Sequence, residues 1–220
     1  MRTVVFDLDG TLANTSGDLI AAANACFRDL GLGDQLDPER DQKTAVRGAK
    51  AMLRLGLDRA GRPDEDVVDA QYQPLLDYYG QAIATHTYLY DGAMEAIAAL
   101  TEAGYRVAIC TNKPEGLAVQ LLTALGVQDR FHATLGADTL PVRKPDPEHL
   151  FETVRRAGGD PALCLLVGDT ETDRKTAHAA GVPSVLVTFG PAGEDMAALE
   201  PAALLDHYRD LPRVVRALIG

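Results

Sequence analysis

Residues 3–11 read Thr-Val-Val-Phe-Asp-Leu-Asp-Gly-Thr, in which a short apolar run leads directly into two acids, a glycine and a threonine. Such a run is typical of a strand that is buried on both faces of a parallel sheet. Strand alternation points the side chains of Asp7 and Asp9 the same way, and Gly10 permits a sharp turn beside a ligand. Because ligands bind at the carboxyl ends of strands in open α/β sheets, we expect a functional site here. Taken alone, the motif is also compatible with a loop or part of a calcium site.

The same strand pattern returns further along the chain. Short apolar runs that end in polar or glycine-rich turns predict strands at residues 106–110, 132–135, 163–167 and 184–188. Helical spacing and helix start and stop signals predict helices at residues 92–103, 114–125, 147–157 and 171–180. This alternation predicts an α/β fold in which helices cover both faces of a parallel sheet.

Residues 14–83 break the alternation, because they show helical patterns and no convincing strand. Periodicity predicts helices over residues 18–30 and 41–55, and a third helix opens at the Pro-Asp-Glu-Asp sequence of residues 63–66. We expect residues 14–83 to form an inserted all-helical cap domain. The core domain then comprises residues 1–13 together with residues 84–220.

The charge of the chain is strongly acidic: 32 Asp and Glu residues against 21 Lys and Arg residues give a formal net charge of -11. Like-charge repulsion therefore argues against nucleic acid or an anionic membrane as a partner. Residues 40–62 are a local exception, with seven bases and two acids. Five of these bases recur at helical steps of three and four: Arg40, Lys43, Arg47, Lys50 and Arg54. Such a face is either solvated or aimed at an anionic substrate.

Cysteine usage and hydropathy indicate the compartment. Cys26, Cys110 and Cys164 are widely spaced and form no CxxC pair, which is typical of reduced core thiols in a cytoplasmic protein. No apolar run approaches the roughly 18 residues that a membrane-spanning helix needs. The first residues meet acids too early for a secretory signal. We therefore expect a cytoplasmic protein with no membrane partner.

Three further groups of polar residues follow later predicted strands. Thr111 and Asn112 stand between a strand and a helix, where a hydroxyl, an amide and helix N-terminal N–H groups can hold an anion. Lys144 lies in a stiff proline-containing loop and is one of only five lysines in the chain. Asp169 and Asp173 lie four residues apart, so their carboxylates can converge on a hard cation. Each group alone could be a helix cap, a surface charge or a first-turn acid, but their common placement predicts one site.

Together the motifs resemble those of the haloacid dehalogenase superfamily: DxDGT at residues 7–11, Thr111, Lys144 and GDxxxD at residues 168–173, in the family's order. The resemblance covers nearly the whole chain, and residues 14–83 resemble the family's small helical cap. The sequences at the last three motifs resemble the phosphoglycolate phosphatase branch in particular. The resemblance implies a Rossmann-like three-layer core with a parallel sheet and an enzyme that hydrolyses phosphomonoesters.

The resemblance also implies roles for the acids. Asp7 would attack phosphorus and form an aspartyl-phosphate, which water then hydrolyses. Asp9 would donate a proton to the leaving oxygen and then take one from the attacking water. Mg²⁺ would bind the Asp7 carboxylate, the Asp9 backbone carbonyl and Asp169, with Asp173 bound directly or through water.

The remaining implied roles concern the substrate. Thr111, Asn112 and Lys144 would hold the transferring phosphoryl group, and Lys144 would also neutralise developing charge. In the cap, Arg47 and Lys50 lie in a stretch that resembles the specificity loop of small-cap members, so they would bind a carboxylate or second phosphate unless they belong to a solvated face.

The expected substrate is a small phosphorylated metabolite, with 2-phosphoglycolate the leading candidate. Two alternatives remain: a sugar-phosphate phosphomutase, and a non-catalytic binding module, against which the four intact motifs argue. Lys113 and Lys175, which flank the motifs, are interpreted as rim charges rather than catalysts.

Overall fold

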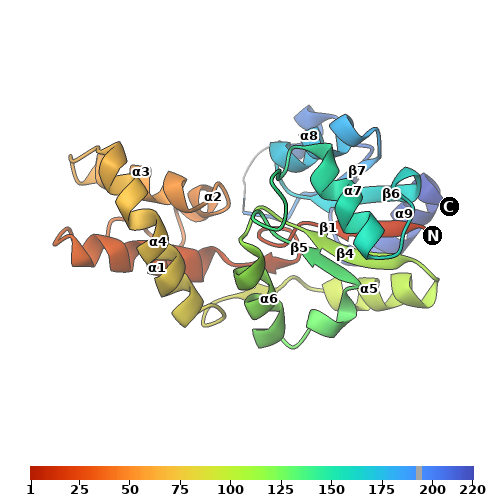
Figure 1. Cartoon of the computed structure of the whole chain (residues 1–220), viewed down its shortest axis with the longest axis horizontal. Helices are drawn as coiled ribbons and strands as arrows, with labels where there is room; N and C mark the ends of the chain where they lie inside the picture. Colours follow the sequence, from red (N-terminus) through yellow and green to blue (C-terminus); the bar gives the residue numbers. More distant parts are fainter. Residues whose placement is uncertain (192–194) are drawn as a thin grey trace. The chain divides into compact units, whose positions relative to one another are not determined.

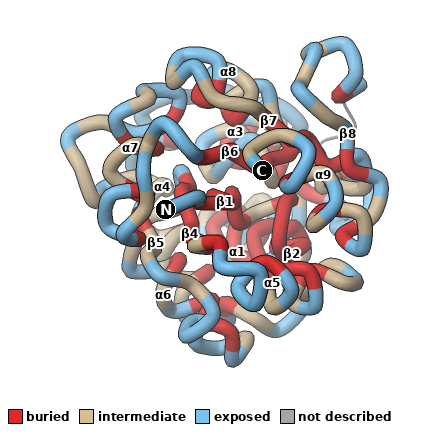
Figure 2. The backbone as a smooth tube through the Cα atoms, turned by 90° about the vertical axis from the view of Figure 1, so that its right-hand side faces the viewer, coloured by how far each residue is buried: buried red, intermediate tan, exposed pale blue. Residues whose placement is uncertain are grey.

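The computed structural model describes residues 1–191 and 195–220, and a six-stranded parallel sheet is the centre of the larger part of this described chain. Its strand order is β5-β4-β1-β6-β7-β8. The strands are β1 Thr3–Phe6, β4 Arg106–Cys110, β5 Ala133–Leu135, β6 Cys164–Gly168, β7 Ser184–Val187 and β8 Ala203–Leu205. In the middle of the sheet, Val5 of β1 lies opposite Ala108 of β4 and Leu166 of β6. All of β1 is buried (Figure 2), as the continuous apolar run predicts.

Helices cover both faces of this sheet (Figure 1). On one face, α7 (Pro147–Arg156) and α8 (Glu171–Ala180) contact the strands, and on the other α5 (Ala93–Glu102), α6 (Glu115–Ala124) and α9 (Leu211–Ile219) do so. Short 3₁₀ helices lie at Gln128–Arg130, Pro161–Leu163, Met196–Leu199 and Tyr208–Asp210. The three layers and the parallel sheet confirm the fold class predicted from the sequence.

One strand and one α-helix of this sheet unit were not predicted. β8 is a three-residue edge strand, which is too short to show a recognisable alternation. α9 buries Leu211 and Val215, which lie four residues apart, so the helical signal was present near the end of the chain. All the strands and helices that were predicted in the sheet unit begin and end within two residues of their bounds in the structure.

Residues Asn14–Tyr88 form a second compact unit that consists mainly of helices. The helices are α1 Ser16–Asp29, α2 Gln42–Ala45, α3 Ala49–Arg59 and α4 Glu65–Gln81. α1 packs against both α3 and α4. A Cβ at Gly56 of α3 would lie 2.1 Å from the Phe27 ring of α1, so the close approach of these two helices requires glycine there.

The boundary of the helical unit falls after Tyr88, whereas the sequence indicated residue 83. Two short strands, β2 (Ala13–Asn14) and β3 (Tyr88–Leu89), pair where the chain leaves and re-enters the sheet unit. Asp18 of α1 accepts hydrogen bonds from the backbone N–H groups of His86 (2.9 Å) and Thr87 (2.8 Å). These bonds hold the last residues of the segment to α1, so they belong to the helical unit.

The helix predicted over residues 41–55 is interrupted. α2 ends at Ala45 and α3 begins at Ala49, and between them Gly48 adopts φ +97°, a conformation that favours glycine. The five regularly spaced bases are therefore divided among the loop before α2, α2, the turn and α3, and the prediction of one continuous basic helix face was wrong. In the part of the chain that the structure describes, no helix combines the length and apolar character needed to cross a membrane.

Candidate active site

Polar side chains gather where neighbouring parallel strands of the central sheet end. Asp7 directly follows β1, Thr111 follows β4 and Asp169 follows β6. The backbone N–H of Asp7 donates to the Val167 carbonyl (2.9 Å), which continues the β1–β6 pairing to the first acid of the motif. Because parallel strands end at the same edge, residues that are far apart in sequence meet here, as the sequence predicted.

Lys144 connects two of the acids. Its ammonium lies 3.1 Å from Asp7 Oδ2 and 2.7 Å from Asp173 Oδ1, and its side chain is only 1% exposed. Burial alone would lower the pKa of Lys144, but the charges of Asp173 and Asp7 outweigh it and raise that pKa. Lys144 therefore remains a fixed positive charge beside both carboxylates.

Asp173 is held rigidly by the start of α8. Its Oδ2 accepts hydrogen bonds from the Thr170 hydroxyl (2.6 Å), the Thr170 N–H (3.1 Å) and the Asp169 N–H (3.2 Å). The Thr170 hydroxyl in turn accepts from the Asp173 N–H, which completes a capping box. A Cβ at Gly168 would lie 2.3 Å from Asp173 Cγ, so this packing also depends on a glycine at the end of β6.

Asp169 presents a buried oxygen that lacks a partner. Its Oδ1 accepts from the Thr11 hydroxyl (2.8 Å), whereas its Oδ2 has no hydrogen-bond partner among the described residues. Burial, together with the charges of Asp173 and Asp7, raises the pKa of Asp169. Gly10 approaches so closely, at φ +80°, that a Cβ there would lie 2.2 Å from Asp169 Oδ2. A buried carboxylate oxygen left without a donor is costly unless a cation or proton occupies it.

These residues fit a divalent cation. Asp7, Asp169 and Asp173 each offer a carboxylate oxygen, and the three oxygens lie within 4.8 Å of one another. Carboxylate oxygens are the ligands that hard cations prefer. Lys144 and Lys113 pair with Asp7, Asp173 and Asp9, so the four motif carboxylates, when ionised, carry two more negative charges than the two ammonium groups balance. A divalent cation would balance that excess.

Asp7 is the most accessible of the three clustered acids. Its side chain is 12% exposed, whereas Asp173 and Asp169 are completely buried. Burial raises the pKa of Asp7 to about 6, against the opposing effect of Lys144 and with further contributions from Asp173 and Asp9. Its Oδ1 accepts from the Leu8 N–H (2.7 Å), so both oxygens are oriented. An oriented, partly accessible carboxylate can act as a nucleophile.

The residues after β4 are also held in place. Thr111 is buried; its N–H donates to the Leu135 carbonyl (3.0 Å), and its hydroxyl oxygen accepts from the Lys113 N–H (3.2 Å). The Asn112 side-chain amide donates to the Lys144 carbonyl (3.0 Å). Asn112 therefore braces the Lys144 loop, a contact that the sequence did not predict.

The interpretation of Lys113 as a rim charge was wrong. Its side chain is 3% exposed, and its ammonium lies 2.9 Å and 3.1 Å from the two carboxylate oxygens of Asp9. Lys175, by contrast, is exposed and pairs with Glu171 one helical turn away (3.0 Å), as expected for a rim charge. One signal in the sequence could have indicated that Lys113 belongs to the site: it directly follows Thr111 and Asn112, in a chain with only five lysines.

Tyr208 is a support that sequence analysis missed. Its hydroxyl donates to the Thr11 carbonyl (2.7 Å) across 197 positions of sequence, which no local pattern could predict. The Phe189 ring packs between Tyr208 and Tyr90, with centroid distances of 5.4 Å and 5.0 Å. Through Tyr208, this aromatic cluster contacts Thr11, the last residue of the motif that begins with Asp7.

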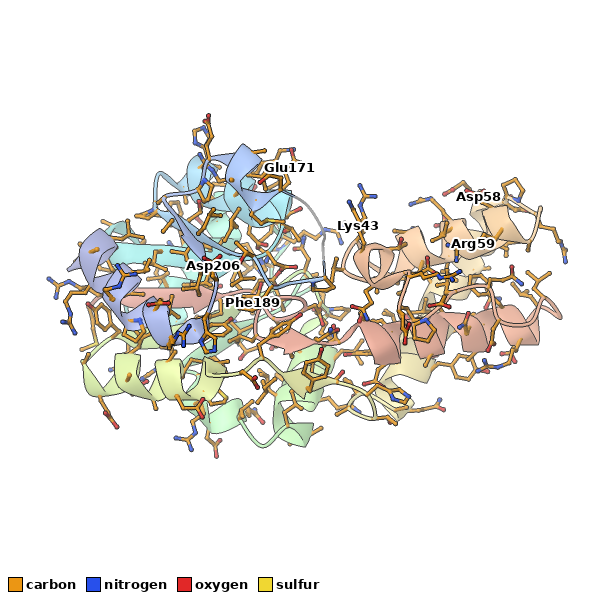
Figure 3. The ribbon with its side chains drawn as sticks, turned by 180° about the vertical axis from the view of Figure 1, so that it is seen from behind. Lys43, Asp58, Arg59, Glu171, Phe189 and Asp206 are labelled. Atoms are coloured by element: carbon orange, nitrogen blue, oxygen red, sulfur yellow. The ribbon has the colours of Figure 1, made fainter. Side chains whose placement is uncertain are left out.

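The basic residues proposed for substrate binding lie in the helical unit. Lys50 pairs with Asp69 (2.6 Å) and lies 5.6 Å from the centre of the Tyr72 ring. Arg47 is exposed and has no ion pair within the described residues. Arg59, on the same helix as Lys50, donates two hydrogen bonds to the buried carboxylate of Asp41 (2.6 Å and 2.7 Å), and Figure 3 shows it within this unit. Substrate binding by Arg47 and Lys50 stays a prediction.

The sequence and the fold match known proteins. Residues 4–187 match the family described as haloacid dehalogenase-like hydrolase. A phosphoglycolate phosphatase of Mesorhizobium japonicum is 39% identical, over 97% of this chain and 96% of its own. A phosphoglycolate phosphatase of Caulobacter vibrioides is 36% identical, over 99% of this chain and 92% of its own. The crystal structure of a predicted phosphoglycolate phosphatase from Haemophilus somnus has a TM-score of 0.86 and 29% identity, with 97% of each chain covered.

Proposed function

The chain belongs to the haloacid dehalogenase-like hydrolases, and from that premise we propose that it is a magnesium-dependent phosphomonoesterase whose substrate is 2-phosphoglycolate. Near full-length relatives named phosphoglycolate phosphatase support the substrate class. The observation that carries the proposal is the geometry around Asp7, a partly accessible carboxylate that contacts the buried ammonium of Lys144 and lies close to the unpaired oxygen of Asp169.

Asp7 is the proposed nucleophile. One of its oxygens forms a bond to phosphorus while the bond between phosphorus and the ester oxygen breaks, which gives an aspartyl-phosphate. Water then attacks the phosphorus and restores the carboxylate. The hydrogen bond from Leu8 and the contact with Lys144 support this role, because they hold both oxygens in fixed directions before the substrate arrives.

Asp9 is the proposed proton donor and acceptor. The leaving oxygen of an alkyl phosphate is a strongly basic alkoxide, so a proton must reach it as the bond breaks. The ionised Asp9 then accepts a proton from the attacking water. Its position two residues after Asp7, with its side chain partly exposed, supports access to both reactants.

Thr111, Asn112 and Lys144 are the proposed holders of the transferring oxygens. The hydroxyl oxygen of Thr111 accepts from the backbone, which leaves its hydrogen available to a phosphoryl oxygen. Lys144 adds a fixed positive charge in a setting that excludes water, where such charge stabilises a transition state most strongly. The contact of Asn112 with the Lys144 carbonyl supports a common placement of these groups.

The proposed magnesium ligands are the Asp7 carboxylate, the Asp9 backbone carbonyl, Asp169 and Asp173. The unpaired Oδ2 of Asp169 supports direct binding there. Both oxygens of Asp173 already accept from protein donors, which supports binding through water. When bound, the cation would neutralise charge on the phosphoryl oxygens and on the carboxylates.

The proposed substrate is a small phosphorylated carboxylic acid, and the proposed compartment is the cytoplasm. The exposed guanidinium of Arg47 supports binding of a carboxylate by the helical unit. The three cysteines, Cys26, Cys110 and Cys164, are all free and buried, which supports a reducing compartment.

A phosphate-release screen tests this function. Purified protein with Mg²⁺ is assayed on 2-phosphoglycolate, sugar phosphates and nucleoside monophosphates, with EDTA and Asp7→Asn as controls. We expect phosphate release to be fastest from 2-phosphoglycolate and to be lost in both controls. Turnover in EDTA would contradict the metal assignment. Transfer of phosphate to a second sugar hydroxyl without release would instead identify a phosphomutase.

A further inference from the structure

We infer that Lys113 is a positioning residue of the reaction, because its ammonium holds the Asp9 carboxylate where a proton must be transferred. This inference rests on the proposed function, since proton transfer by Asp9 belongs to it. The Lys113 ammonium contacts both carboxylate oxygens of Asp9, at 2.9 Å from Oδ1 and 3.1 Å from Oδ2. Contact with both oxygens restricts rotation of the carboxylate as well as its position.

The pair of Lys113 and Asp9 is largely buried, so breaking it costs more free energy than breaking a surface ion pair does. The side chains of Lys113 and Asp9 are 3% and 20% exposed. Removing an ammonium from water is costly unless a carboxylate compensates for it, so Asp9 and Lys113 depend on each other. The greater exposure of Asp9 leaves one side of the carboxylate open to a reactant.

The backbone of Lys113 is fixed on both sides, so the side chain starts from a rigid base. Its N–H donates to the Thr111 hydroxyl (3.2 Å), and its carbonyl accepts from the Ala137 N–H (2.9 Å). A Cβ at Gly136 would lie 2.7 Å from the Lys113 carbonyl oxygen, so the loop after β5 packs directly against it. Lys113 thus has the supporting framework that precise positioning requires.

The two buried lysines divide the acids between them. Lys144 contacts Asp7 and Asp173, whereas Lys113 contacts Asp9. Asp7 and Asp9 are neighbouring like charges with opposite tasks, one bonding to phosphorus and the other moving a proton. Each of these two carboxylates therefore has an ammonium partner of its own.

The dependence of rate on the leaving group distinguishes positioning of Asp9 from general structural support. An alkoxide leaving group needs a proton, whereas the nitrophenolate released from p-nitrophenyl phosphate does not. We expect Lys113→Met to lower kcat on 2-phosphoglycolate, or on the alkyl phosphate that the screen identifies, by a factor on the order of 100. The pre-steady-state burst of nitrophenolate from p-nitrophenyl phosphate, which reports formation of the aspartyl-phosphate, should change little, because only the later hydrolysis of that intermediate uses Asp9 as a base.

A double-mutant cycle with Asp9→Asn completes the test. In the Asp9→Asn background, Lys113→Met should lower kcat on the alkyl phosphate no further, because Lys113 acts through Asp9. Lys113→Arg, which retains a cation, should recover part of the alkyl phosphatase rate. Lys175→Met is the matched control, since Lys175 lies beside the motifs but on the surface, and both rates should be unchanged.

The outcomes separate the inference from the proposed function. Equal loss of the alkyl phosphatase rate and of the nitrophenolate burst rate in Lys113→Met, or a further loss of the alkyl phosphatase rate in the Asp9→Asn background, would overturn the positioning role alone. Equal loss of the alkyl phosphatase rate and of the nitrophenolate burst rate in Asp9→Asn itself would overturn the proton-transfer role on which the inference rests. Thermal unfolding of each variant shows whether it is folded. If Lys113→Met does not fold, Lys113→Arg takes its place, and equal impairment of both rates by that variant overturns the inference.

Discussion

Two regions of this molecule place their basic residues in different surroundings. At the end of the central sheet, Lys144 and Lys113 are 1% and 3% exposed and contact the motif acids. In the helical unit, Lys50 and Arg54 are 45% and 49% exposed and pair with Asp69 and Glu65 at the surface.

The lengths of these ion pairs do not distinguish the two regions, because all fall between 2.6 Å and 3.1 Å. Burial does. Breaking a buried pair leaves an uncompensated charge away from water, whereas a surface pair is screened and contributes about 0–1 kcal/mol. The difference teaches that Lys144 and Lys113 cannot lose their acids without a large cost in stability, whereas the surface pairs of Lys50 and Arg54 are individually replaceable.

The strongest test of this contrast removes the acid at its centre. We expect Asp7→Asn to lower kcat for phosphate release by a factor on the order of 10⁴ or more, because no other group supplies the nucleophile. Phosphate release with Mg²⁺ measures the effect, and circular dichroism shows whether the variant is folded. Unchanged phosphate release in a folded variant would exclude Asp7 as the nucleophile.

The second test compares one lysine from each region. Lys144→Met should destabilise the protein by about 3 kcal/mol or more, because two buried carboxylates lose their partner. Lys50→Met should change the free energy of unfolding by less than about 1 kcal/mol. Urea denaturation in EDTA measures both changes. Similar losses in the two variants would show that burial does not separate the two regions.

The third test uses pH. In the folded, metal-free protein the pKa of Asp7 is raised from 3.8 to about 6, so the folded state binds this proton more tightly than the unfolded state does. The resulting stabilisation is fully present below pH 3.8 and is lost as pH rises through about 6. We expect the stability of the wild type relative to Asp7→Asn, measured by urea denaturation in EDTA, to fall by about 2 kcal/mol between pH 4 and pH 7. A difference that rises over that range would contradict the raised pKa.

The smallest expected effect concerns the helical unit. Arg47→Ala should raise KM several-fold for a phosphorylated carboxylic acid and less for p-nitrophenyl phosphate, because a guanidinium binds carboxylates. Steady-state kinetics on both substrates measures the two KM values, with Lys43→Ala as a matched exposed control from α2. Equal changes in KM for the two substrates would assign Arg47 to the solvated surface.

Much of the sheet unit was predictable from local sequence. The run before Asp7 and the glycine-terminated segments after it carry their own periodicity, and these patterns predicted the main strands and their flanking helices. The helix break at Gly48 was missed because helical spacing of charges continues across the glycine. The backbone conformation of a single glycine overrides that spacing.

The sequence by itself determined the order of strands and helices, the motif acids and the family, because each of these depends on residues that are close together along the chain. Only the tertiary structure decided which base partners which acid. Lys113 and Asp9 are 104 residues apart, and burial of their contact comes from strands and loops that meet after folding. Sequence charge patterns do not reveal the burial of an ion pair, and burial is what distinguishes Lys113 from Lys175.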